Sequence, residues 1–473
     1  MSVTQFFVKV VLQNSFFVKV VVSPFVAMAA TNEVIVAMVP FPDYSHINNL
    51  FDLARYMASH NIPVHFLCFA DVNKDLKLRF QGGFNIHFND LLRPSSPIEK
   101  EDRYGVPPIL MYLEKLKEPI YEICVELSTK AKRLVIIHDL IMSEPILDVH
   151  TLLNVKSYIF QTGSTFNRYS ALKQTIPDII DDDYDHEKLV KQMQDEFPLL
   201  EPHEKFRFKM ELELKHQSGE IINSCKEVEG RYPELLANAK EKPIWAFGPF
   251  HMLLDSSSSN NMTRSLELFL DKQDDNSVIF VSFGSTTTLS QEQVNELARG
   301  LEQSNHRFIW VLRKGDNVEK LKEKLDGKIE LPEGFEERVE GRGMVVNWAP
   351  QLEILGHSST GGFLSHCGWN SCIESISMGV PLATWPISYD HPFNSILVTN
   401  LLKIGISVKS WSHRDELVTA STIEKAVKTL MGTIQGDEMR QRAVELSEKI
   451  KSSASRGGLA RKEMESFISH IIK

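Results

Sequence analysis

A short stretch in the last third of the chain combines glycines, a histidine and small polar side chains. Residues 361–371 read Gly-Gly-Phe-Leu-Ser-His-Cys-Gly-Trp-Asn-Ser, where a strand-like apolar run passes into a helical pattern. Glycine lets the backbone approach a ligand closely, and the first amides of a helix attract anions. We expect Asn370 and Ser371 to cap this helix, because their side chains favour that position. The stretch therefore predicts a site for an anion such as a diphosphate.

Neighbouring side chains extend this predicted site to a whole nucleotide. His366 adds a hydrogen-bond donor, and Glu374, one helical turn further on, has a carboxylate that can grip two ribose hydroxyls. Trp348 ends the preceding strand-like run and offers a flat face for a base. Trp369 has two interpretations, since its side chain can contact the ligand or only pack the turn.

A second group of residues, in the first half of the chain, has the chemistry of a base. His46 follows the first strand-like run, and an imidazole with a pKa of about 6.5 can take a proton near neutral pH. Asp139 directly follows a buried run and can hold the other ring nitrogen. Taken alone, a histidine in a loop is more often a surface residue, and an aspartate after a strand is more often only a turn former. His138 competes as the base, but strand alternation sends it to the face opposite Asp139.

The elements that must position these residues alternate between strand-like and helical patterns, which predicts parallel βαβ units. In open parallel sheets, ligands bind outside the carboxyl ends of the strands, and the candidate residues fall there. The sequence therefore predicts an α/β protein of two doubly wound domains that face each other. The expected strands cover residues 34–40, 64–70, 134–139, 158–160, 278–283, 308–312, 344–348, 362–365 and 382–385, and the expected helices 47–60, 291–303, a helix from 370, and 459–472.

The division of the chain follows shifts in composition. We expect an N-terminal extension over residues 1–30, a first domain over 31–250, a serine-rich linker over 251–264, a second domain over 265–455 and a C-terminal helix over 456–473. That helix has no strand after it, and we expect it to dock where apolar surface remains. The extension resembles a secretion signal, but Pro24 interrupts its apolar run, so we favour a nonessential extension.

Composition excludes several classes of protein. With 52 basic and 62 acidic side chains, the net charge of −10 disfavours a nucleic-acid partner, and 42% hydrophobic residues suit a chain with a buried core. The five cysteines lack zinc-site spacing, which favours a reducing compartment and no structural metal. The sequence contains no apolar run of about 18 residues, so we predict no membrane-spanning helix. We expect a cytoplasmic monomer with no integral membrane segment.

The segment from Trp348 to His391 resembles the signature of plant family-one UDP-dependent glycosyltransferases over nearly its whole length. Similarity to this family runs from Glu33 to the C-terminus, and residues 137–140 and 223–230 look nearest to the branch that glycosylates cytokinins such as zeatin. The resemblance implies two facing Rossmann-like domains of GT-B type, with the acceptor and the UDP-sugar in the cleft between them. No metal is expected, because no Asp-x-Asp motif stands at a comparable strand end, and helix amides with His366 can stabilise the leaving UDP.

The resemblance also implies a role for each candidate residue. His46 and Asp139 form the catalytic pair, Trp348 stacks on uracil, and Glu374 binds the ribose. Thr162 aligns with a residue that touches the sugar. The residues expected to bind the donor are Thr162, Ser285, Trp348, Gln351, His366, Trp369, Asn370, Ser371, Glu374, Asp390 and His391.

Two positions depart from the family pattern. Relatives commonly carry a glycine before the catalytic histidine, whereas this chain has Ser45, so the turn must form without that freedom. The signature ends in Asp390 and His391, where glucose-using relatives carry Asp-Gln or Glu-Gln. An imidazole presents one donor and one acceptor at a different angle from an amide. Histidine here goes with galactose or arabinose donors in the family, so glucose and non-glucose donors both stay open.

These observations predict an inverting enzyme that moves a sugar from a UDP-sugar to a hydroxyl of a small apolar plant metabolite, giving a β-O-glycoside. The acceptor could be a cytokinin, a flavonoid or a terpenoid alcohol. A nicotinamide dehydrogenase is disfavoured, because no Gly-x-Gly-x-x-Gly follows the first strand. A non-catalytic nucleotide-sugar-binding protein is the alternative. Several side chains suit an acceptor pocket for a flat, apolar molecule, and core packing explains each of them equally well. They are Tyr104, Met111, Tyr112, Phe166 and Tyr169.

Overall fold

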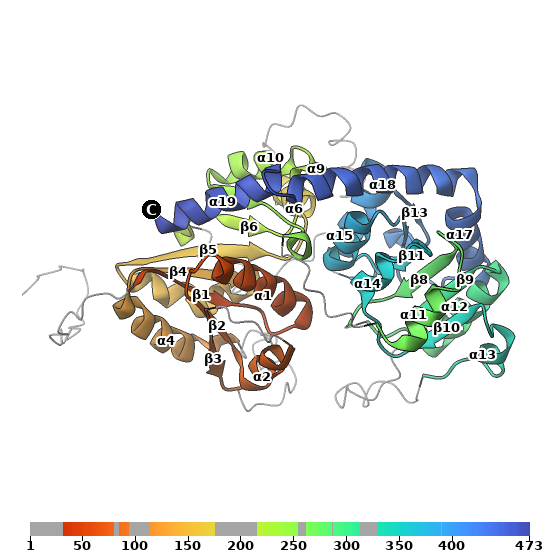
Figure 1. The fold of residues 1–473 in the computed structure, drawn as a ribbon, viewed down its shortest axis with the longest axis horizontal. Helices are drawn as coiled ribbons and strands as arrows, with labels where there is room; N and C mark the ends of the chain where they lie inside the picture. The colour runs from red at the N-terminus through yellow and green to blue at the C-terminus, as the bar shows by residue number, and fades with distance from the viewer. Residues whose placement is uncertain are drawn as a thin grey trace, which may run out of the picture.

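The structure of this chain is a computed structural model that describes residues 32–79, 85–93, 113–175, 215–253, 262–285, 287–312, 329–388 and 390–473. These residues form two parallel β-sheets, each covered by helices, and the two halves lie side by side (Figure 1). The predicted α/β class with two doubly wound domains is confirmed. The extension over residues 1–30 and three of the suggested acceptor-pocket residues, Tyr104, Met111 and Tyr112, lie outside the described residues.

The first domain is built on a seven-stranded sheet in the order β3-β2-β1-β4-β5-β6-β7, with all neighbouring strands parallel. Central strands are buried on both faces, as their continuous apolar runs require, and Val36 and Ile136 are fully buried there. The strands are β1 (Asn32–Val39), β2 (Val64–Phe69), β3 (Ile86–Leu91), β4 (Ala131–Asp139), β5 (Val155–Gln161), β6 (Glu220–Ile222) and β7 (Ile244–Ala246). The helices are α1 (Tyr44–Ser59), α2 (Ala70–Arg79), α4 (Lys117–Lys130), η1 (Leu140–Met142), α5 (Ser143–Ile146), η2 (Leu147–Thr151), α6 (Thr165–Thr175), α9 (Lys226–Glu229), α10 (Tyr232–Lys240) and η3 (Phe250–Met252).

The second domain has a six-stranded parallel sheet in the order β10-β9-β8-β11-β12-β13. Its strands are β8 (Val278–Ser282), β9 (Arg307–Val311), β10 (Gly343–Val346), β11 (Thr360–Ser365), β12 (Leu382–Thr384) and β13 (Gly405–Ser407). The helices are α11 (Arg264–Leu270), α12 (Gln291–Ser304), α13 (Phe335–Arg338), α14 (Gln351–Leu355), α15 (Trp369–Met378), α16 (His391–Ile396), η4 (Leu397–Leu401), η5 (Trp411–His413), α17 (Ala420–Gly432) and α18 (Ile434–Ala454), and α19 (Leu459–Ile472) follows at the end of the chain.

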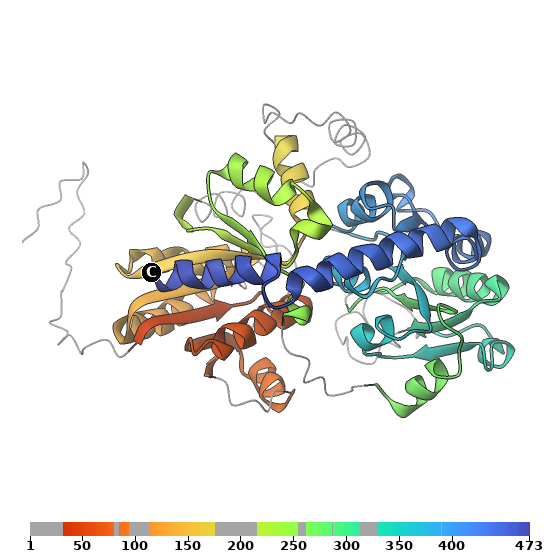
Figure 2. The same ribbon diagram turned by 45° about the horizontal axis from the view of Figure 1, so that its top comes forward.

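The last two helices bring the chain back from the second domain to the first (Figures 1 and 2). The apolar face of α19 joins the core of the first domain, where the ring of Phe467 lies 5.0 Å from that of Trp245 and 5.4 Å from that of Tyr158. Arg133 also donates a hydrogen bond of 3.0 Å to the carbonyl of Ile471. The apolar surface that receives the C-terminal helix is therefore on the first domain.

The segment between the sheets is described only in part. The helix η3 covers the start of the stretch that we expect to be a linker, α11 begins at its end, and residues 254–261 lie outside the described residues. The division of the chain into 31–250, 251–264 and 265–455 stays a prediction.

Candidate active site

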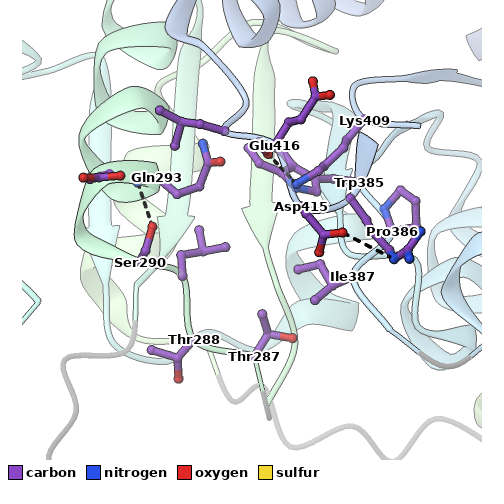
Figure 3. Close-up of a pocket in the computed structure, with 14 residues that line it drawn as sticks. Thr287, Thr288, Ser290, Gln293, Trp385, Pro386, Ile387, Lys409, Asp415 and Glu416 are labelled. Carbon is purple, nitrogen blue, oxygen red and sulfur yellow. Dashed lines mark hydrogen bonds and ion pairs between the residues drawn. The ribbon is translucent and has the colours of Figure 1, made fainter. Parts of the chain in front are cut away.

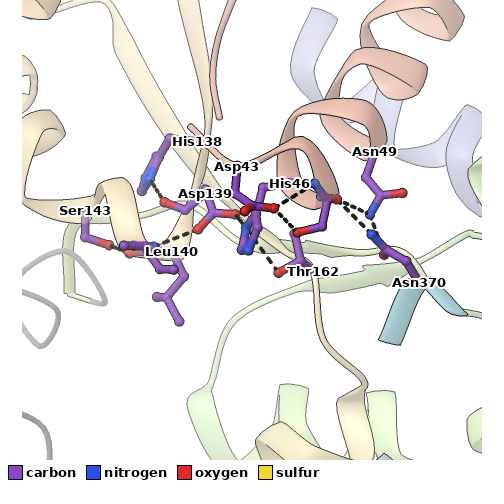
Figure 4. A network of polar contacts seen from close by, with 11 residues as sticks. Asp43, His46, Asn49, His138, Asp139, Leu140, Ser143, Thr162 and Asn370 are labelled. Atoms are coloured by element: carbon purple, nitrogen blue, oxygen red, sulfur yellow. Dashed lines mark hydrogen bonds and ion pairs between the residues drawn. The ribbon is translucent and has the colours of Figure 1, made fainter. Parts of the chain in front are cut away.

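The side chains of His46 and Asp139 meet where β1 and β4 end (Figure 4). His46 Nδ1 lies 2.6 Å from Asp139 Oδ2, and the other carboxylate oxygen of Asp139 accepts a 2.9 Å hydrogen bond from the amide of Ile141. Asp139 is only 2% exposed, whereas the His46 side chain is 19% exposed. Since Nδ1 donates to the carboxylate, Nε2 carries the free lone pair. Thr162 Oγ1 lies 3.4 Å from the same Nδ1.

The turn before His46 forms without a glycine. Asp43 has an extended backbone and caps α1, because its side chain accepts a 2.8 Å hydrogen bond from the amide of Ser45. Ser45 is not among the described residues with a positive φ. A serine therefore fits before the histidine without a left-handed backbone.

The pKa of His46 is set by opposing effects. Burial lowers it, but the charge of Asp139 and the hydrogen bond to it raise it, with smaller contributions from Asp43 and Asp390. The net pKa lies above the ordinary histidine value. His138, the competing candidate, is fully buried and its Nδ1 lies 2.9 Å from the carbonyl oxygen of Asp139, so it is held away from the cleft.

The start of α15 has no side-chain cap. Gly368 is the N-cap residue, and the first helical hydrogen bond runs from the amide of Cys372 to the carbonyl of Gly368. Our expectation that Asn370 and Ser371 cap this helix was wrong, because the helix begins at Trp369 and both lie inside its first turn. The amides of a first turn have no partners inside the helix, so an anion can take them.

The side chains of Gln351, Ser371 and Glu374 form a cluster between α14 and α15. Gln351 Nε2 donates to Ser371 Oγ at 3.0 Å and to Glu374 Oε2 at 2.7 Å. Burial raises the pKa of Glu374 to about 7, and the nearby charge of Asp52 adds to this, although the Gln351 hydrogen bond opposes it. Trp348 lies close by in sequence and is 58% exposed, so one face of its indole is open to a ligand.

His366 is packed between two glycines. A Cβ atom on Gly284 would lie 2.5 Å from His366 Nε2, and one on Gly368 would lie 2.6 Å from the same atom. Burial lowers the pKa of His366 to about 4, despite an opposing effect of the Ser282 backbone, so the ring is neutral near pH 7. Ser285 is exposed in the turn that follows β8.

The ring of His391 stands edge-on to that of His366, with centroids 4.8 Å apart. Its Nδ1 accepts hydrogen bonds from the amides of Ile387 at 3.4 Å and Ser388 at 3.2 Å. Burial lowers the pKa of His391 to about 3, and the charge of His366 contributes. The sequence suggested that this imidazole offers one donor and one acceptor. The acceptor, Nδ1, is engaged by two backbone amides, so the Nε2 proton is the group that remains for a ligand.

Comparison with known proteins agrees with this geometry. Residues 32–252 match a family model described as "Glycosyltransferase, N-terminal domain", and residues 242–450 match one described as "UDP-glucoronosyl and UDP-glucosyl transferase". The chain is also 43% identical to a zeatin O-glucosyltransferase of Phaseolus lunatus over 93% of this chain and 97% of the relative. This chain belongs to the UDP-glucoronosyl and UDP-glucosyl transferase family. The predicted glycosyltransferase activity and the resemblance to the zeatin branch of the plant enzymes are confirmed.

Other relatives of this glycosyltransferase support the same assignment. A zeatin O-xylosyltransferase of Phaseolus vulgaris is 42% identical over 94% of this chain and 99% of its own length. The Phytolacca americana enzyme UGT2, solved with UDP-2fluoro-glucose and pterostilbene, has a TM-score of 0.75 and 27% identity, covering 94% of this chain and 100% of that one. Medicago truncatula UGT71G1, solved with UDP-glucose, has a TM-score of 0.73 and 26% identity, covering 94% and 99%.

Several aromatic side chains of the glycosyltransferase lie in cores rather than in a ligand site. Trp369 is 3% exposed, and its Nε1 donates to the carbonyl of Asn223 at 2.9 Å, which favours the packing interpretation over a donor contact. Phe166 and Tyr169, suggested for the acceptor pocket, lie on α6, are fully buried and pack against Tyr232. Core packing is therefore the correct interpretation for both.

Sequence reasoning missed three asparagines that join the two domains of the glycosyltransferase. Asn394 is fully buried, and its Nδ2 donates to Asp390 Oδ2 at 2.8 Å and to the carbonyl of Cys367 at 3.0 Å. Its Oδ1 accepts a 3.2 Å hydrogen bond from Ser164 of the first domain. Asn49 and Asn223 make similar contacts near α15. Asn223 lies in the segment 223–230 that carries the family resemblance, but no local motif indicates these interdomain contacts, because the partners of Asn49 and Asn394 are far away in the sequence.

A pocket of about 300 Å³ opens at the carboxyl edge of the second sheet (Figure 3). Its lining comes from residues between 287 and 293 after β8, 385–387 after β12 and 409–417 after β13. None of the residues expected to bind the donor lines it. The pocket borders that group, because the amide of its lining residue Ile387 donates to His391.

The described residues also bear on the metal and membrane expectations. No three His, Cys, Asp or Glu side chains among them gather as a set that could hold a metal ion. None of the helices in the described part of the chain is both long enough and apolar enough to cross a bilayer. All five cysteines are free and buried.

Proposed function

We propose that this glycosyltransferase moves a sugar from a UDP-sugar to a hydroxyl group of a small apolar plant metabolite, with inversion at the anomeric carbon. The observation that carries the proposal is the 2.6 Å contact between His46 Nδ1 and Asp139 Oδ2, which leaves Nε2 of the same ring as the proton acceptor. A base within hydrogen-bond reach of the acceptor hydroxyl is what this reaction needs.

In the proposed step, the acceptor oxygen attacks the anomeric carbon while its proton passes to His46 Nε2. The bond between that carbon and the diphosphate oxygen breaks, and UDP leaves with the electron pair. Asp139 stabilises the imidazolium as it forms. The open amides of α15 and the neutral His366 donate to the diphosphate as its charge grows. Attack from the side opposite UDP converts an α-linked donor into a β-linked product.

The other site residues take the roles that the family pattern implies. Trp348 stacks on uracil, Gln351 holds the base and the ribose, and Glu374 binds the ribose hydroxyls. The diphosphate is held by Ser285, His366, Asn370 and Ser371, and the sugar by Thr162, Asp390 and His391. The clustering of Gln351, Ser371 and Glu374 and the edge-on contact of His366 with His391 support this assignment.

For the acceptor, we propose zeatin or a related cytokinin. The two Phaseolus relatives, at 43% and 42% identity, are named for transfer to zeatin. They do not decide the donor, since one is named for glucose and the other for xylose. We propose that His391 ranks the donors through its single Nε2 proton, because a buried polar group left unpaired costs about 1 to 3 kcal/mol.

A matrix of donors and acceptors, read by the mass of the product, tests this proposal. The donors are UDP-glucose, UDP-galactose, UDP-xylose and UDP-arabinose, and the acceptors are zeatin, a flavonoid and a terpenoid alcohol. We expect one donor to transfer to zeatin, and His391→Gln to change the donor ranking. An unchanged ranking contradicts the role of His391. Proton coupling at the anomeric carbon of the product should indicate a β-linkage, and an α-linkage contradicts inversion.

We also propose that transfer needs no metal ion, because helix amides and His366 are available to stabilise the leaving UDP. Excess EDTA should then leave the rate unchanged, and a loss restored by Mg²⁺ contradicts this. The free, buried cysteines support a cytoplasmic protein. We propose a monomer, which light scattering on the purified protein tests directly.

A further inference from the structure

Asn49 lies one turn after His46 on α1 and makes three hydrogen bonds with its side-chain amide. Figure 4 shows the one to Asn370. Its Nδ2 donates to the carbonyl of Ser45 at 3.0 Å and to Asn370 Oδ1 at 2.6 Å. Its Oδ1 accepts a 3.1 Å hydrogen bond from Asn223 Nδ2. One side chain of the first domain is thus bonded to its own helix, to the loop after β6 and to the first turn of α15.

The partners of Asn49 are themselves tied together. Asn370 Nδ2 donates to the carbonyl of Ser45 at 2.8 Å, so this carbonyl accepts from both domains. Asn223 Oδ1 accepts from the amide of Phe250 at 3.0 Å, and its carbonyl accepts from Trp369 Nε1 at 2.9 Å. We call Asn49, Asn223, Asn370 and the Ser45 carbonyl the seam. It joins the helix that carries His46 to the helix whose open amides suit a diphosphate.

This arrangement matters because the base and the donor site belong to different domains. Their reacting atoms must be aligned closely, and a misplacement of about 1 Å can reduce a rate about 100-fold. The seam fixes the backbone next to His46, since Ser45 is the preceding residue and its carbonyl accepts from Asn49 and Asn370. Within the seam, Asn49 is the residue on α1 whose side chain reaches both other elements.

We propose that Asn49 is a positioning residue, which holds α1 against α15 so that His46 is aligned with the sugar of a bound donor. This inference rests on the proposed function. It goes beyond that function because Asn49 touches neither the reacting atoms nor the nucleotide in this scheme. Loss of Asn49 should therefore lower kcat without removing the base, its carboxylate partner or the nucleotide site.

The experiment compares Asn49→Ala with Asn48→Ala, its neighbour on α1. Asn48 is a matched control, because it is exposed and contacts Arg79 at 3.4 Å instead of α15. For Asn49→Ala we expect kcat to fall about tenfold or more, while KM for the acceptor and the Kd of UDP alone change by less than about threefold. Asn48→Ala should keep kcat within about twofold of the natural protein.

Two results overturn the proposal. The first is an Asn49→Ala kcat within about twofold of that of Asn48→Ala. The second is a parallel loss of kcat, UDP binding and thermal midpoint, which assigns Asn49 a purely structural role. A natural protein that binds UDP but transfers no sugar, or binds no UDP at all, instead refutes the proposed function. The two failures are therefore distinguishable.

A double-mutant cycle with Asn370 gives a second test. If Asn49 acts through Asn370, then Asn49→Ala should have little further effect on kcat in an Asn370→Ala background. Effects on kcat that simply multiply contradict the coupling. Asn49→Asp keeps the acceptor for Asn223 but loses the donor to Asn370, so it should behave like Asn49→Ala in kcat. An Asn49→Asp variant with the natural kcat overturns the proposal.

Discussion

The pKa of His46 depends on whether burial or the neighbouring carboxylates dominate. Burial alone lowers it, and the charge and hydrogen bond of Asp139 reverse that effect. A base must be deprotonated to act, so kcat/KM should rise with pH through the pKa of His46, above the ordinary histidine value of about 6.5. Below this pKa the ring is protonated and cannot accept the proton of the acceptor hydroxyl.

Asp139→Asn tests this interpretation of His46. With the carboxylate charge gone, burial dominates, and the rise in kcat/KM should move to lower pH. The maximal rate should also fall by about 100-fold or more, because an amide stabilises the imidazolium poorly. Profiles of kcat/KM between about pH 5 and 9 measure both effects. A rise at the same pH in both proteins contradicts the assigned cause.

The pKa of Glu374 makes a prediction about stability. It is raised to about 7 from 4.5, mainly by burial, so the folded state holds a proton that the unfolded state releases. In that range the native state binds more protons, and the free energy of unfolding should fall as pH rises from about 5 to 8. Glu374→Gln should remove about 1–3 kcal/mol of this fall.

Denaturant unfolding at the two pH values measures this contribution. Glu448→Gln on α18 is the control, because its side chain is exposed. It should leave the pH dependence unchanged. If the free energy of unfolding of Glu374→Gln depends on pH as that of the natural protein does, then burial of the Glu374 charge does not cause this dependence.

The turn after β8 and the start of α15 close around His366, so the glycines of these elements should be sensitive to substitution. Gly284 has a φ of +77°, and its added Cβ would meet the imidazole at 2.5 Å. Gly457 has a similar φ of +81° but nothing within 4 Å. Both alanine variants should lose about 1 kcal/mol of stability from backbone strain. Gly284→Ala should in addition weaken UDP binding and transfer.

Calorimetry with UDP compares the two glycine variants. Gly457→Ala should bind UDP as the natural protein does, whereas Gly284→Ala should bind it at least about tenfold more weakly. Equal binding by both variants would show that His366 can move aside, or that it does not contact the diphosphate.

The sequence predicted the central strands of both sheets well, but the expected helices left out α4, α17 and α18, which are among the longest. β1, β2, β4 and β8 are buried, continuous apolar runs, and such runs predict strands of a parallel sheet. The three-residue strands β6, β7 and β13 were not predicted, although β12, which also has three residues, fell within the expected strand 382–385. The start of α15 was displaced by one residue, because Asn and Ser favour the N-cap position that Gly368 occupies.

The site followed the same division. A local pattern identifies its candidate motif residues, whose roles stay a prediction, and the pairing of His46 with Asp139 followed from the ends of neighbouring strands. The contact between Asn49 and Asn370 joins residues 321 positions apart. Asparagine on a helix surface has no distinctive pattern, so only the packing of the two domains could reveal it.

On the scale of the whole molecule, the return of the C-terminal helix should contribute strongly to stability. Phe467 is fully buried among rings of the first domain, whereas Ile472 on the same helix is 49% exposed. Phe467→Ala should cost about 3–5 kcal/mol of unfolding free energy, and Ile472→Ala less than about 0.5 kcal/mol. Denaturant unfolding measures both values. Equal losses would mean that α19 is not docked in solution.

The two domains together must place a base from one beside a sugar nucleotide held by the other, and the His46→Gln variant tests this most directly. We expect its turnover with saturating UDP-sugar and acceptor to fall by about 10²- to 10⁴-fold, because the proposed general base is lost. UDP binding by the same variant should stay unchanged, which shows that the protein is folded. Turnover by His46→Gln at the natural rate would contradict the account.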